Sequence, residues 1–401
     1  MAPIAIDPTP VVEERDTSTE IAALKAILKK QENVVLPPDN TLRRYLKAGI
    51  DLSNGYPYHP PKPDFVQDVK KIRTDLREYQ DPALRADPEK KALFGAANEV
   101  KNLTSHIGTE IIGLQLKDLT DKQKDELALL VAERSIVFLR DQDLSPQQQQ
   151  ALGLYLGDGE IERHPQAPQV PGLGGGISLI WEKGHKDQIV SSRTKRVPYG
   201  GVFGWHTDLV HEAFPPGYTH LHQDTVPEVG GDTLWASGYA AYDKLSPAFQ
   251  KVLDGLNGIY RSAHKYKDAE DPEGDAKYVT RVHPLIRTHP VTGWKALWIN
   301  QSMTVGIQGF DKVESDAILN YLYGVYERST DIQLRWHWTP GTSAIWDNRS
   351  TIHTVSYDYE GERHGTRVSS LAEKPFFDPN SKSRAQALQL KGWLTPGGLQ
   401  G

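Results

Sequence analysis

The chain has 401 residues, 38% of them hydrophobic, which is enough for one large globular domain with extensions or for two smaller domains. Its formal net charge of −6 provides no basic field that would favour nucleic acid or an acidic membrane. There is no cysteine, so disulfides, thiolate ligands and iron–sulfur clusters are excluded, and any metal must be held by His, Asp or Glu.

The N-terminus lacks the basic start and apolar stretch of a secretory signal. No apolar run reaches the roughly 18 residues that a membrane span requires. We therefore expect a cytoplasmic protein with neither a membrane nor a nucleic-acid partner.

Residues 1–103 are expected to form a helical and irregular extension. Thr17 followed by Glu20 resembles a capping box that opens a short helix, and residues 40–46 resemble a second helix. A proline-rich connector at 56–63 precedes a third predicted helix, which carries Phe65 and Leu76. The apolar stripes of these helices need a surface to cover, so we expect the extension to pack on the domain that follows or on a second subunit of a homo-oligomer.

From residue 104 the pattern becomes mixed. It predicts a helix over 120–133, a buried strand over 135–139, and another helix opened by Ser145 and Pro146 that ends near residue 157. Residues 165–201 include a glycine-rich stretch and a polar stretch. We predict that this insertion is a lid.

Beyond residue 200, short β-like runs alternate with Gly/Pro turns. Strands are predicted at 218–221, 231–236, 296–300, 344–346 and 366–371, and helices near 238–255 and 311–328. The economical architecture is a mainly β core with flanking helices, and a jelly roll can bring distant residues together. We assign residues 104–378 to this domain and 379–401 to a C-terminal tail.

A His-x-Asp pattern at His206 and Asp208 is the main candidate for a metal site. Residues two apart on a strand project from the same face, so one short strand would supply two ligands. His353 follows an apolar strand and a polar turn and would complete the set. Two histidines and one carboxylate on one face of a metal leave the other positions open, which suits a non-haem Fe(II) centre.

Other histidines offer a weaker alternative. His220 and His222 alternate on a predicted strand and could bind zinc, but no third ligand is signalled nearby. His211, His283, His289 and His337 have no partner at ligand spacing.

Arg363 and Arg367 are four residues apart on the last predicted core strand and would point to the same face. Guanidinium groups bind carboxylates or sulfonate-like oxyanions, so two in one cavity imply two anions or one dianion. Thr233 could add a hydroxyl donor to one anion. The alternative is that both arginines lie on the surface and pair with Asp358, Glu360 or Glu362.

The ordered motifs over residues 104–378 resemble the taurine/α-ketoglutarate dioxygenase family of Fe(II)- and 2-oxoglutarate-dependent oxygenases. The extension and the insertion resemble the fungal sulfonate dioxygenases of that family. The resemblance implies a double-stranded β-helix, or jelly-roll, fold. It rests on Val137 to Gln142, Ser145 to Gln149, Trp205 to Asp208, Gly230 to Trp235, His283 to Pro290, Ile345 to Arg349, His353, the Arg363-x-x-x-Arg367 pair and Lys374 to Phe376.

The resemblance also implies roles for individual residues. His206, Asp208 and His353 would bind iron, and Arg363 with Thr233 would hold the distal carboxylate of 2-oxoglutarate. The anionic head of the substrate would be held by Arg367 and His164, and Trp346 would form a wall beside the iron. The substrate lining departs from the family pattern at Val202, Met303 and Ala167.

The predicted reaction is hydroxylation of a small anionic substrate. A sulfonate such as taurine is favoured, and its turnover with O₂ would release sulfite and an aldehyde together with succinate and CO₂. Alternatives within the class are an alkyl sulfate, an aryloxy acid or a quaternary amine. Outside this class of oxygenases, two alternatives are a zinc hydrolase and a non-catalytic jelly-roll binding protein.

Overall fold

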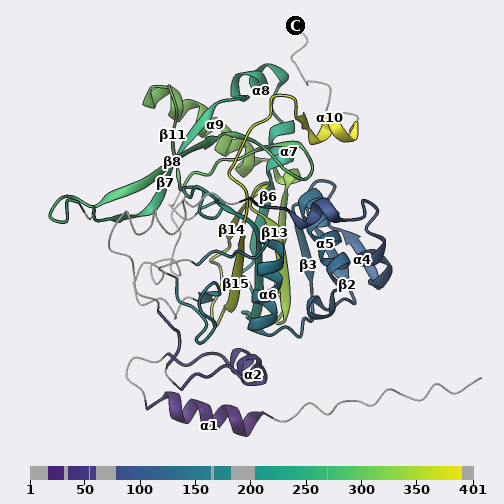
Figure 1. The fold of residues 1–401 in the computed structure, drawn as a ribbon, viewed down its shortest axis with the longest axis vertical. Helices are drawn as coiled ribbons and strands as arrows, with labels where there is room; N and C mark the ends of the chain where they lie inside the picture. Colours follow the sequence, from purple (N-terminus) through teal and green to yellow (C-terminus); the bar gives the residue numbers. More distant parts are fainter. Residues whose placement is uncertain are drawn as a thin grey trace, which may run out of the picture.

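The computed structural model describes residues 17–30, 35–53, 55–59, 78–163, 167–181, 204–268 and 270–390. This part of the chain is mostly β-structure with helices around it (Figure 1). The strands are β1 Glu99–Asn102, β2 Thr109–Ile112, β3 Ile136–Leu139, β4 Ser178–Trp181, β5 Pro216–Thr225, β6 Thr233–Ser237, β7 Asn257–Tyr266, β8 Lys277–Pro284, β9 Ile286–Thr288, β10 Trp294–Leu297, β11 Thr304–Ile307, β12 Gln333–Trp336, β13 Thr342–Asp347, β14 Thr351–Val355, β15 His364–Leu371 and β16 Lys382–Ser383. The α-helices are α1 Ser18–Leu28, α2 Asp39–Lys47, α4 Lys91–Ala96, α5 Asp121–Arg134, α6 Pro146–Leu156, α7 Gly238–Asp243, α8 Pro247–Leu253, α9 Lys312–Arg328 and α10 Arg384–Leu388. Short 3-10 helices lie at Pro82–Arg85, Leu116–Asp118 and Thr330–Ile332.

A seven-stranded sheet forms the main wall of the molecule, in the order β1-β2-β3-β13-β5-β15-β4. All neighbours in it are antiparallel except β2 and β3. Strand β3 is buried along its whole length, which its uninterrupted Ile-Val-Phe-Leu sequence explains. The centre of the sheet therefore needs cover on both faces.

A second sheet, in the order β12-β6-β14, covers the inner face of the first. The core between them is aromatic. Phe138 of β3 stacks on Trp336 of β12 at a ring distance of 3.9 Å, and Trp235 of β6 meets Trp346 of β13 edge-on at 5.7 Å. This core cluster comprises Ile107, Ile136, Phe138, Leu221, Trp235, Trp336, Trp338, Ala344 and Trp346.

Helices α5 and α6 help to cover the outer face of the large sheet, and their starts follow the predicted signals. Thr120 with Gln123, and Ser145 with Gln148, form capping boxes, and Pro146 occupies the first turn of α6. The apolar cluster beneath the two helices includes Leu127, Val131 and Leu152. The predicted helices at 120–133, 145–157 and 311–328 are thus confirmed.

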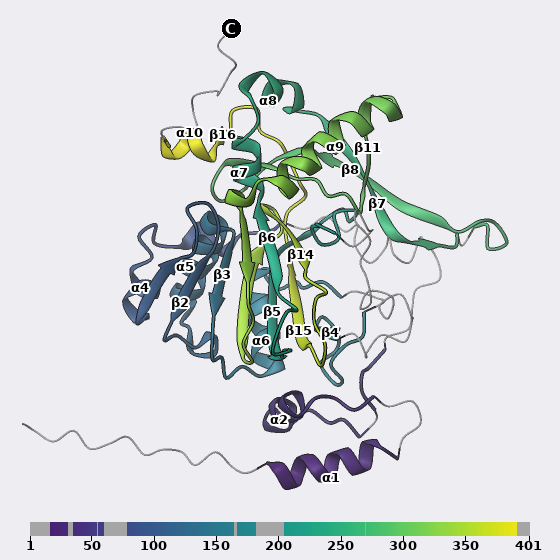
Figure 2. The ribbon, with the colours of Figure 1, turned by 180° about the vertical axis from the view of Figure 1, so that it is seen from behind.

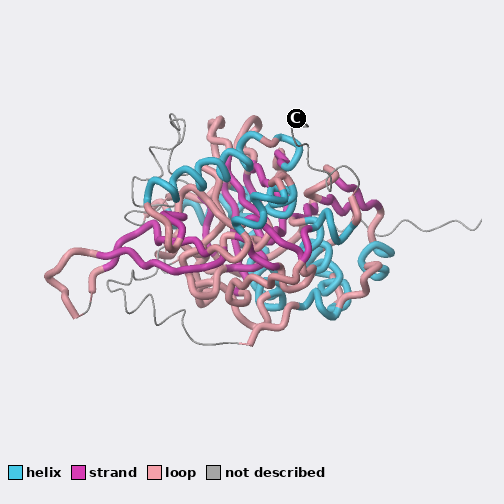
Figure 3. Tube along the Cα trace, turned by 90° about the horizontal axis from the view of Figure 1, so that it is seen from above, coloured by secondary structure: helices cyan, strands magenta, loops and turns pink. Residues whose placement is uncertain are grey.

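Helices α1 and α2 lie at the opposite end of the molecule from α8 and α9 (Figures 1 and 2). Their apolar residues join a cluster that contains Leu179 and Trp181 of β4 and Val368 of β15. Figure 3 shows the β7–β8 hairpin projecting from the body. No helix among the described residues is both long and apolar enough to cross a membrane.

Several local expectations differ from the structure. The predicted helix at 238–255 is two helices, because Ser246 caps a new start with Pro247 in its first turn. Thr17 precedes α1 but makes no side-chain cap bond. Strand β1 lies within the predicted extension, where Val100 is its one apolar residue and gives no alternating pattern.

The predicted helix carrying Phe65 and Leu76 lies outside the described residues. Of the predicted insertion at 165–201, residues 167–181 are described, and they include β4. Strand β16 and helix α10 lie in the segment expected to be a C-terminal tail.

Candidate metal centre

His206 and His353 are brought together by backbone pairing. The amide of His206 donates to the carbonyl of His353 at 2.9 Å, and the amide of His353 donates back at 2.7 Å. Their rings lie 4.3 Å apart. With Asp208 they form a group whose potential ligand atoms all lie within 4.8 Å of one another. The structure therefore brings all three predicted metal ligands into one place.

The expected strand through His206 and Asp208 is wrong in its local form. His206 forms an isolated β-bridge, and a turn follows in which Leu209 has a φ of 52°. A left-handed backbone at a residue other than glycine costs roughly 1–2 kcal/mol. Leu209 is 9% exposed, so its buried side chain offsets part of that cost. The carboxylate of Asp208 therefore reaches the two histidines from a turn and not from a strand.

The hydrogen bond of His206 fixes which ring nitrogen is available. Nδ1 lies 3.1 Å from the carbonyl oxygen of Gly204, and because a carbonyl only accepts, Nδ1 carries the proton. Nε2 then presents its lone pair and lies 3.9 Å from Oδ1 of Asp208. A backbone carbonyl that orients a ligating imidazole in this way is common in metal sites.

His353 is also prepared for metal binding. Burial, followed by the neighbouring His206, lowers the pKa of His353 to about 3. Its imidazole is therefore neutral near pH 7, which is the form that binds a metal. The ring of Trp346 lies 5.1 Å from it and forms one side of the site.

Two imidazoles and one carboxylate on one side fit an Fe(II) centre that keeps positions open for small molecules. Among the described residues, no other group of three such side chains converges in this way.

Arg363 lies beside this group and has only neutral hydrogen-bond partners among the described residues. It is 6% exposed and donates to the carbonyl of Gly231 at 3.0 Å and to Oγ1 of Thr233 at 3.3 Å. The amide oxygen of Gln223, oriented to satisfy its neighbours, accepts from both terminal nitrogens of Arg363, at 3.0 and 3.2 Å. Burial lowers the pKa of Arg363. This buried cation makes no salt bridge within the described chain, which suits a site for an anion.

Arg367 points into the same space. Its guanidinium donates to Oδ1 of Asp208 at 3.1 Å, and its side chain is 20% exposed. The expectation that both arginines share a face is thus confirmed, and Asp358 pairs with Arg335 instead. An anion held by Arg367 would lie next to the metal group.

Met303 packs with Val210, Tyr260 and Trp298 in a small apolar cluster. Val210 is two residues from Asp208, so this cluster supports the turn that carries the carboxylate. His164 and Val202, the other predicted substrate contacts, lie outside the described residues.

His220 and His222, the alternative metal-binding pair, are held by a hydrogen-bonded contact inside the fold. His220 and His222 both contact the hydroxyl of Ser343 at 3.0 Å, on the face of β5 turned away from the metal group. His289 pairs with Asp347, and His337 pairs with Asp232. The predicted alternative of a zinc site at 220 and 222 finds no third ligand in the described structure.

Two residues of the site were missed in the sequence. Gln223 contacts Arg363, and Trp338 donates through its indole nitrogen to Oγ1 of Thr233 at 3.0 Å. Gln223 continues the alternation of Thr219 and Leu221 on β5, a signal that places it on the inner face. Trp338 follows β12 in a loop and carries no comparable signal.

Comparisons with known proteins agree with this geometry. Residues 99–369 match the model of the family described as taurine catabolism dioxygenase TauD, TfdA family. The chain is 36% identical over 319 residues to an alpha-ketoglutarate-dependent sulfonate dioxygenase of Saccharomyces cerevisiae, covering 76% of this chain and 75% of the relative. It is 36% identical over 335 residues to an alpha-ketoglutarate-dependent dioxygenase of Penicillium expansum, covering 80% of this chain and 88% of that one.

Among solved structures, a taurine dioxygenase from Burkholderia xenovorans superposes with a TM-score of 0.59 at 29% identity, over 71% of this chain and 92% of that chain. The family match spans the segment that carries the His-Asp-His group. The chain therefore belongs to the TauD/TfdA family and, with it, to the dioxygenases that use Fe(II), 2-oxoglutarate and O₂.

Proposed function

We propose that the chain hydroxylates a small organic sulfonate, such as taurine, at the carbon that bears the sulfonate. Substrate, 2-oxoglutarate and O₂ would give an aldehyde, sulfite, succinate and CO₂. The sulfonate named for the yeast relative and the taurine named for the Burkholderia structure support this choice. So does the placement of a cationic side chain beside the metal group.

In this proposal His206, Asp208 and His353 hold the iron. When bound, iron with 2-oxoglutarate and O₂ supplies the oxidising power that breaks a substrate C–H bond. The protein's part is to keep the His353 imidazole neutral, to orient the His206 imidazole, and to hold the substrate carbon near the metal.

The observation that carries the proposal is that Arg363 has no salt-bridge partner among the described residues. A buried guanidinium with only neutral partners is costly unless a ligand brings a negative charge. The distal carboxylate of 2-oxoglutarate fits this requirement, with the hydroxyl of Thr233 as a second contact. Thr233 pairs with Val355, two residues beyond His353 on β14, so this anion site adjoins the metal group.

Arg367 would hold the sulfonate. Its contact with Asp208 supports this role, because an anion held by Arg367 would lie near the metal group and the neighbouring carbon could then approach the iron. Trp346 would form the wall beside His353. Contacts from His164, Val202 and Met303 to the substrate stay predictions.

A jelly-roll core is consistent with two sheets that enclose an aromatic interior, and we propose it for residues 104–378. We also propose that the residues up to 103 form an extension packed on that domain, that a lid lies within 165–201, and that 379–401 follow as a tail. A homo-oligomeric state and a cytoplasmic location stay predictions.

The decisive experiment is anaerobic loading with Fe(II) and 2-oxoglutarate, followed by O₂ and a panel of sulfonates, alkyl sulfates, aryloxy acids and quaternary amines. Succinate and sulfite are measured for each compound. We expect sulfite with a sulfonate. Inorganic sulfate released from a sulfate ester, or succinate coupled to an aryloxy acid or an amine, would assign the same chemistry to that substrate and overturn the sulfonate.

Two variants test the site in the same assay. His206→Ala should lose iron binding and turnover, by more than the roughly 10–100-fold that removing a hydrogen-bond partner of a metal ligand costs. Arg367→Ala should mainly raise the substrate concentration required. Wild-type turnover in His206→Ala, or O₂-independent activity with zinc, would reject the iron site.

A further inference from the structure

Strand β15 has two polar faces with different partners. Arg363, just before the strand, and Arg367 within it face the metal group. His364 and Thr366 alternate with them on the opposite, outer face of the sheet, and both are fully buried. A contact with His364 or Thr366 on the outer face therefore acts on a residue that is the direct chain neighbour of Arg363 or Arg367.

Arg44 of α2 is the central contact on this outer face. Its guanidinium donates to Oγ1 of Thr366 at 2.7 Å, to Oε1 of Gln149 at 3.0 Å and to the carbonyl of Leu144 at 2.7 Å. Gln149 of α6 in turn donates to the carbonyl of Thr366 at 2.8 Å. Arg44 thus ties helix α2, helix α6 and strand β15 together.

A second chain of contacts reaches His364. Its Nδ1 lies 2.9 Å from Oδ1 of Asp224, and its Nε2 lies 2.6 Å from the hydroxyl of Tyr56. Thr41 of α2 donates to the same carboxylate at 2.7 Å, and Arg44 lies 3.4 Å from its other oxygen. Burial raises the pKa of Asp224, but His364, Arg44 and Thr41 together lower it to about 2, so the carboxylate is ionised and tightly held.

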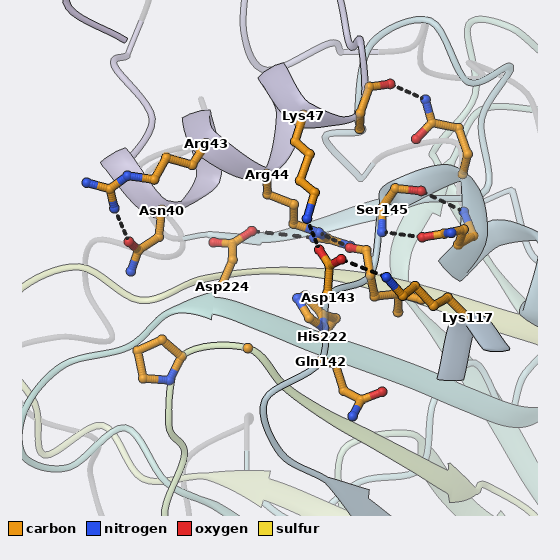
Figure 4. Close-up of a pocket in the computed structure, with 16 residues that line it drawn as sticks. Asn40, Arg43, Arg44, Lys47, Lys117, Gln142, Asp143, Ser145, His222 and Asp224 are labelled. Carbon is orange, nitrogen blue, oxygen red and sulfur yellow. Dashed lines mark hydrogen bonds and ion pairs between the residues drawn. The ribbon is translucent and has the colours of Figure 1, made fainter. Parts of the chain in front are cut away.

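The polar contacts that α2 makes with residues beyond 103 lie on one side of the helix. Figure 4 shows Arg44 and Lys47 reaching from α2 toward Asp224 and Asp143, across a cavity of about 630 Å³. On its other side α2 packs through Leu42 and Tyr45 into the apolar cluster with β4 and β15. Because that packing does not involve Arg44, removing Arg44 should leave α2 docked.

We propose that helix α2 of the N-terminal extension is a positioning element for the anion-binding arginines, and that Arg44 is its key residue. By fixing Thr366 and, through Asp224, His364, it holds the outer side of β15 and so aligns Arg363 and Arg367 on the inner side. This inference rests on the proposed function, in which those arginines bind 2-oxoglutarate and the substrate. Arg44 touches neither ligand.

The test compares Arg44→Ala, Arg44→Lys and the control Lys47→Ala in the full chain. Lys47 lies on the same helix and pairs with the exposed Asp143, which Lys117 also contacts, so its removal takes one charge but no contact with β15. The measurements are 2-oxoglutarate binding by anaerobic calorimetry, Fe(II) affinity, and hydrogen exchange of the amides at 363–368. We expect Arg44→Ala to weaken 2-oxoglutarate binding roughly tenfold and to speed exchange at 363–368, with Fe(II) affinity unchanged.

Arg44→Lys should restore only part of the loss, because an ammonium cannot replace the four contacts that the guanidinium makes with Leu144, Asp224, Thr366 and Gln149. Lys47→Ala should match the wild type. Wild-type binding and exchange in Arg44→Ala would overturn the proposal, and so would equal losses of iron and 2-oxoglutarate affinity, since these indicate general loosening.

A double-mutant cycle separates this inference from the proposed function. With Arg363→Met already present, Arg44→Ala should cause no further loss of 2-oxoglutarate binding, whereas independent roles would give additive losses. If Arg363→Met alone binds 2-oxoglutarate normally, the proposed function fails. If Arg363→Met weakens binding but Arg44→Ala does not, only the positioning role fails.

Should Arg44→Ala not fold, Thr366→Val removes the hydroxyl that Arg44 binds and keeps the side-chain shape. It should reproduce the exchange and binding changes, and wild-type values would again overturn the proposal.

Discussion

Two buried arginines of this chain have opposite electrostatic surroundings. Arg349 has no exposed side-chain surface and bonds to Asp347 at 2.8 and 2.7 Å and to Asp81 at 2.7 Å. Burial alone would lower its pKa, but Asp347 and Asp81 raise it well above the ordinary value. Arg363 is almost as buried, yet its partners are a carbonyl, a hydroxyl and an amide, and burial lowers its pKa.

The difference separates a structural cation from one that we propose binds a ligand. Arg349 is neutralised by its own chain and ties Asp81, ahead of the sheet, to the end of β13. No carboxylate among the described residues bonds to Arg363, and Asp232 acts on its charge only from a distance. A bound dicarboxylate would supply the direct partner.

Arg349→Leu should give the larger effect on stability. Removing the cation leaves carboxylates buried together without compensation, which typically costs about 3–5 kcal/mol of unfolding free energy. Urea denaturation of the metal-free protein measures it. Lys312→Ala breaks an exposed pair with Asp316 and serves as the control, with a loss below about 0.5 kcal/mol. A loss under about 1 kcal/mol for Arg349→Leu would show that the network is not structural.

Arg363→Met should affect binding instead. Removing one partner of a buried charged contact costs about 2–5 kcal/mol of 2-oxoglutarate binding free energy. The unfolding free energy of the ligand-free protein should hardly fall, because no carboxylate in the described chain loses its partner. Calorimetry and urea denaturation on the same preparation measure both quantities. Arg367→Met should weaken substrate more than 2-oxoglutarate, and interchanged effects would mean that the two assignments are reversed.

Taken one residue at a time, the smallest expected effect is the pH dependence of stability that each buried histidine contributes. Burial lowers the pKa of His220 to about 3 and that of His283 to about 4. Below about pH 6.5 the unfolded chain therefore binds protons that the folded chain does not. Each group should lower the unfolding free energy by about 1.4 kcal/mol per pH unit as the pH falls from 6.5 toward 4.

Denaturation of the metal-free protein at pH 7, 6 and 5 measures this slope. His283→Gln should reduce it by the contribution of one proton. Equal unfolding free energies at pH 7 and pH 5 would contradict the neutral, buried state of these histidines.

The sequence predicted the parts of the fold that depend on local signals. Capping boxes marked the starts of α5 and α6, and uninterrupted apolar residues marked β3. The sequence also predicted the three residues of the metal group, because His206, Asp208 and His353 stand in a recognisable order of motifs. Arg363 and Arg367 were placed on one face by strand alternation alone.

The remaining features depend on contacts between distant segments. The bridge between His206 and His353 and the left-handed turn at Leu209 are imposed by tertiary structure, so local alternation predicted a strand instead. The partnership of Asp81 with Arg349 spans 268 residues and has no local signal. The alternation of side chains along a strand predicted that His220 and His222 share one face. It did not predict that this face is turned away from the metal group.

Electroneutrality gives the arginine pair a further consequence. With neutral imidazoles, Asp208, Arg363 and Arg367 leave the protein's share of the site with a single positive charge. A divalent metal raises it to three, and 2-oxoglutarate brings it back to one. One monovalent anionic head group beside the metal then makes the site neutral, so the charge there favours a sulfonate or sulfate group over a phosphate dianion or a cationic head group.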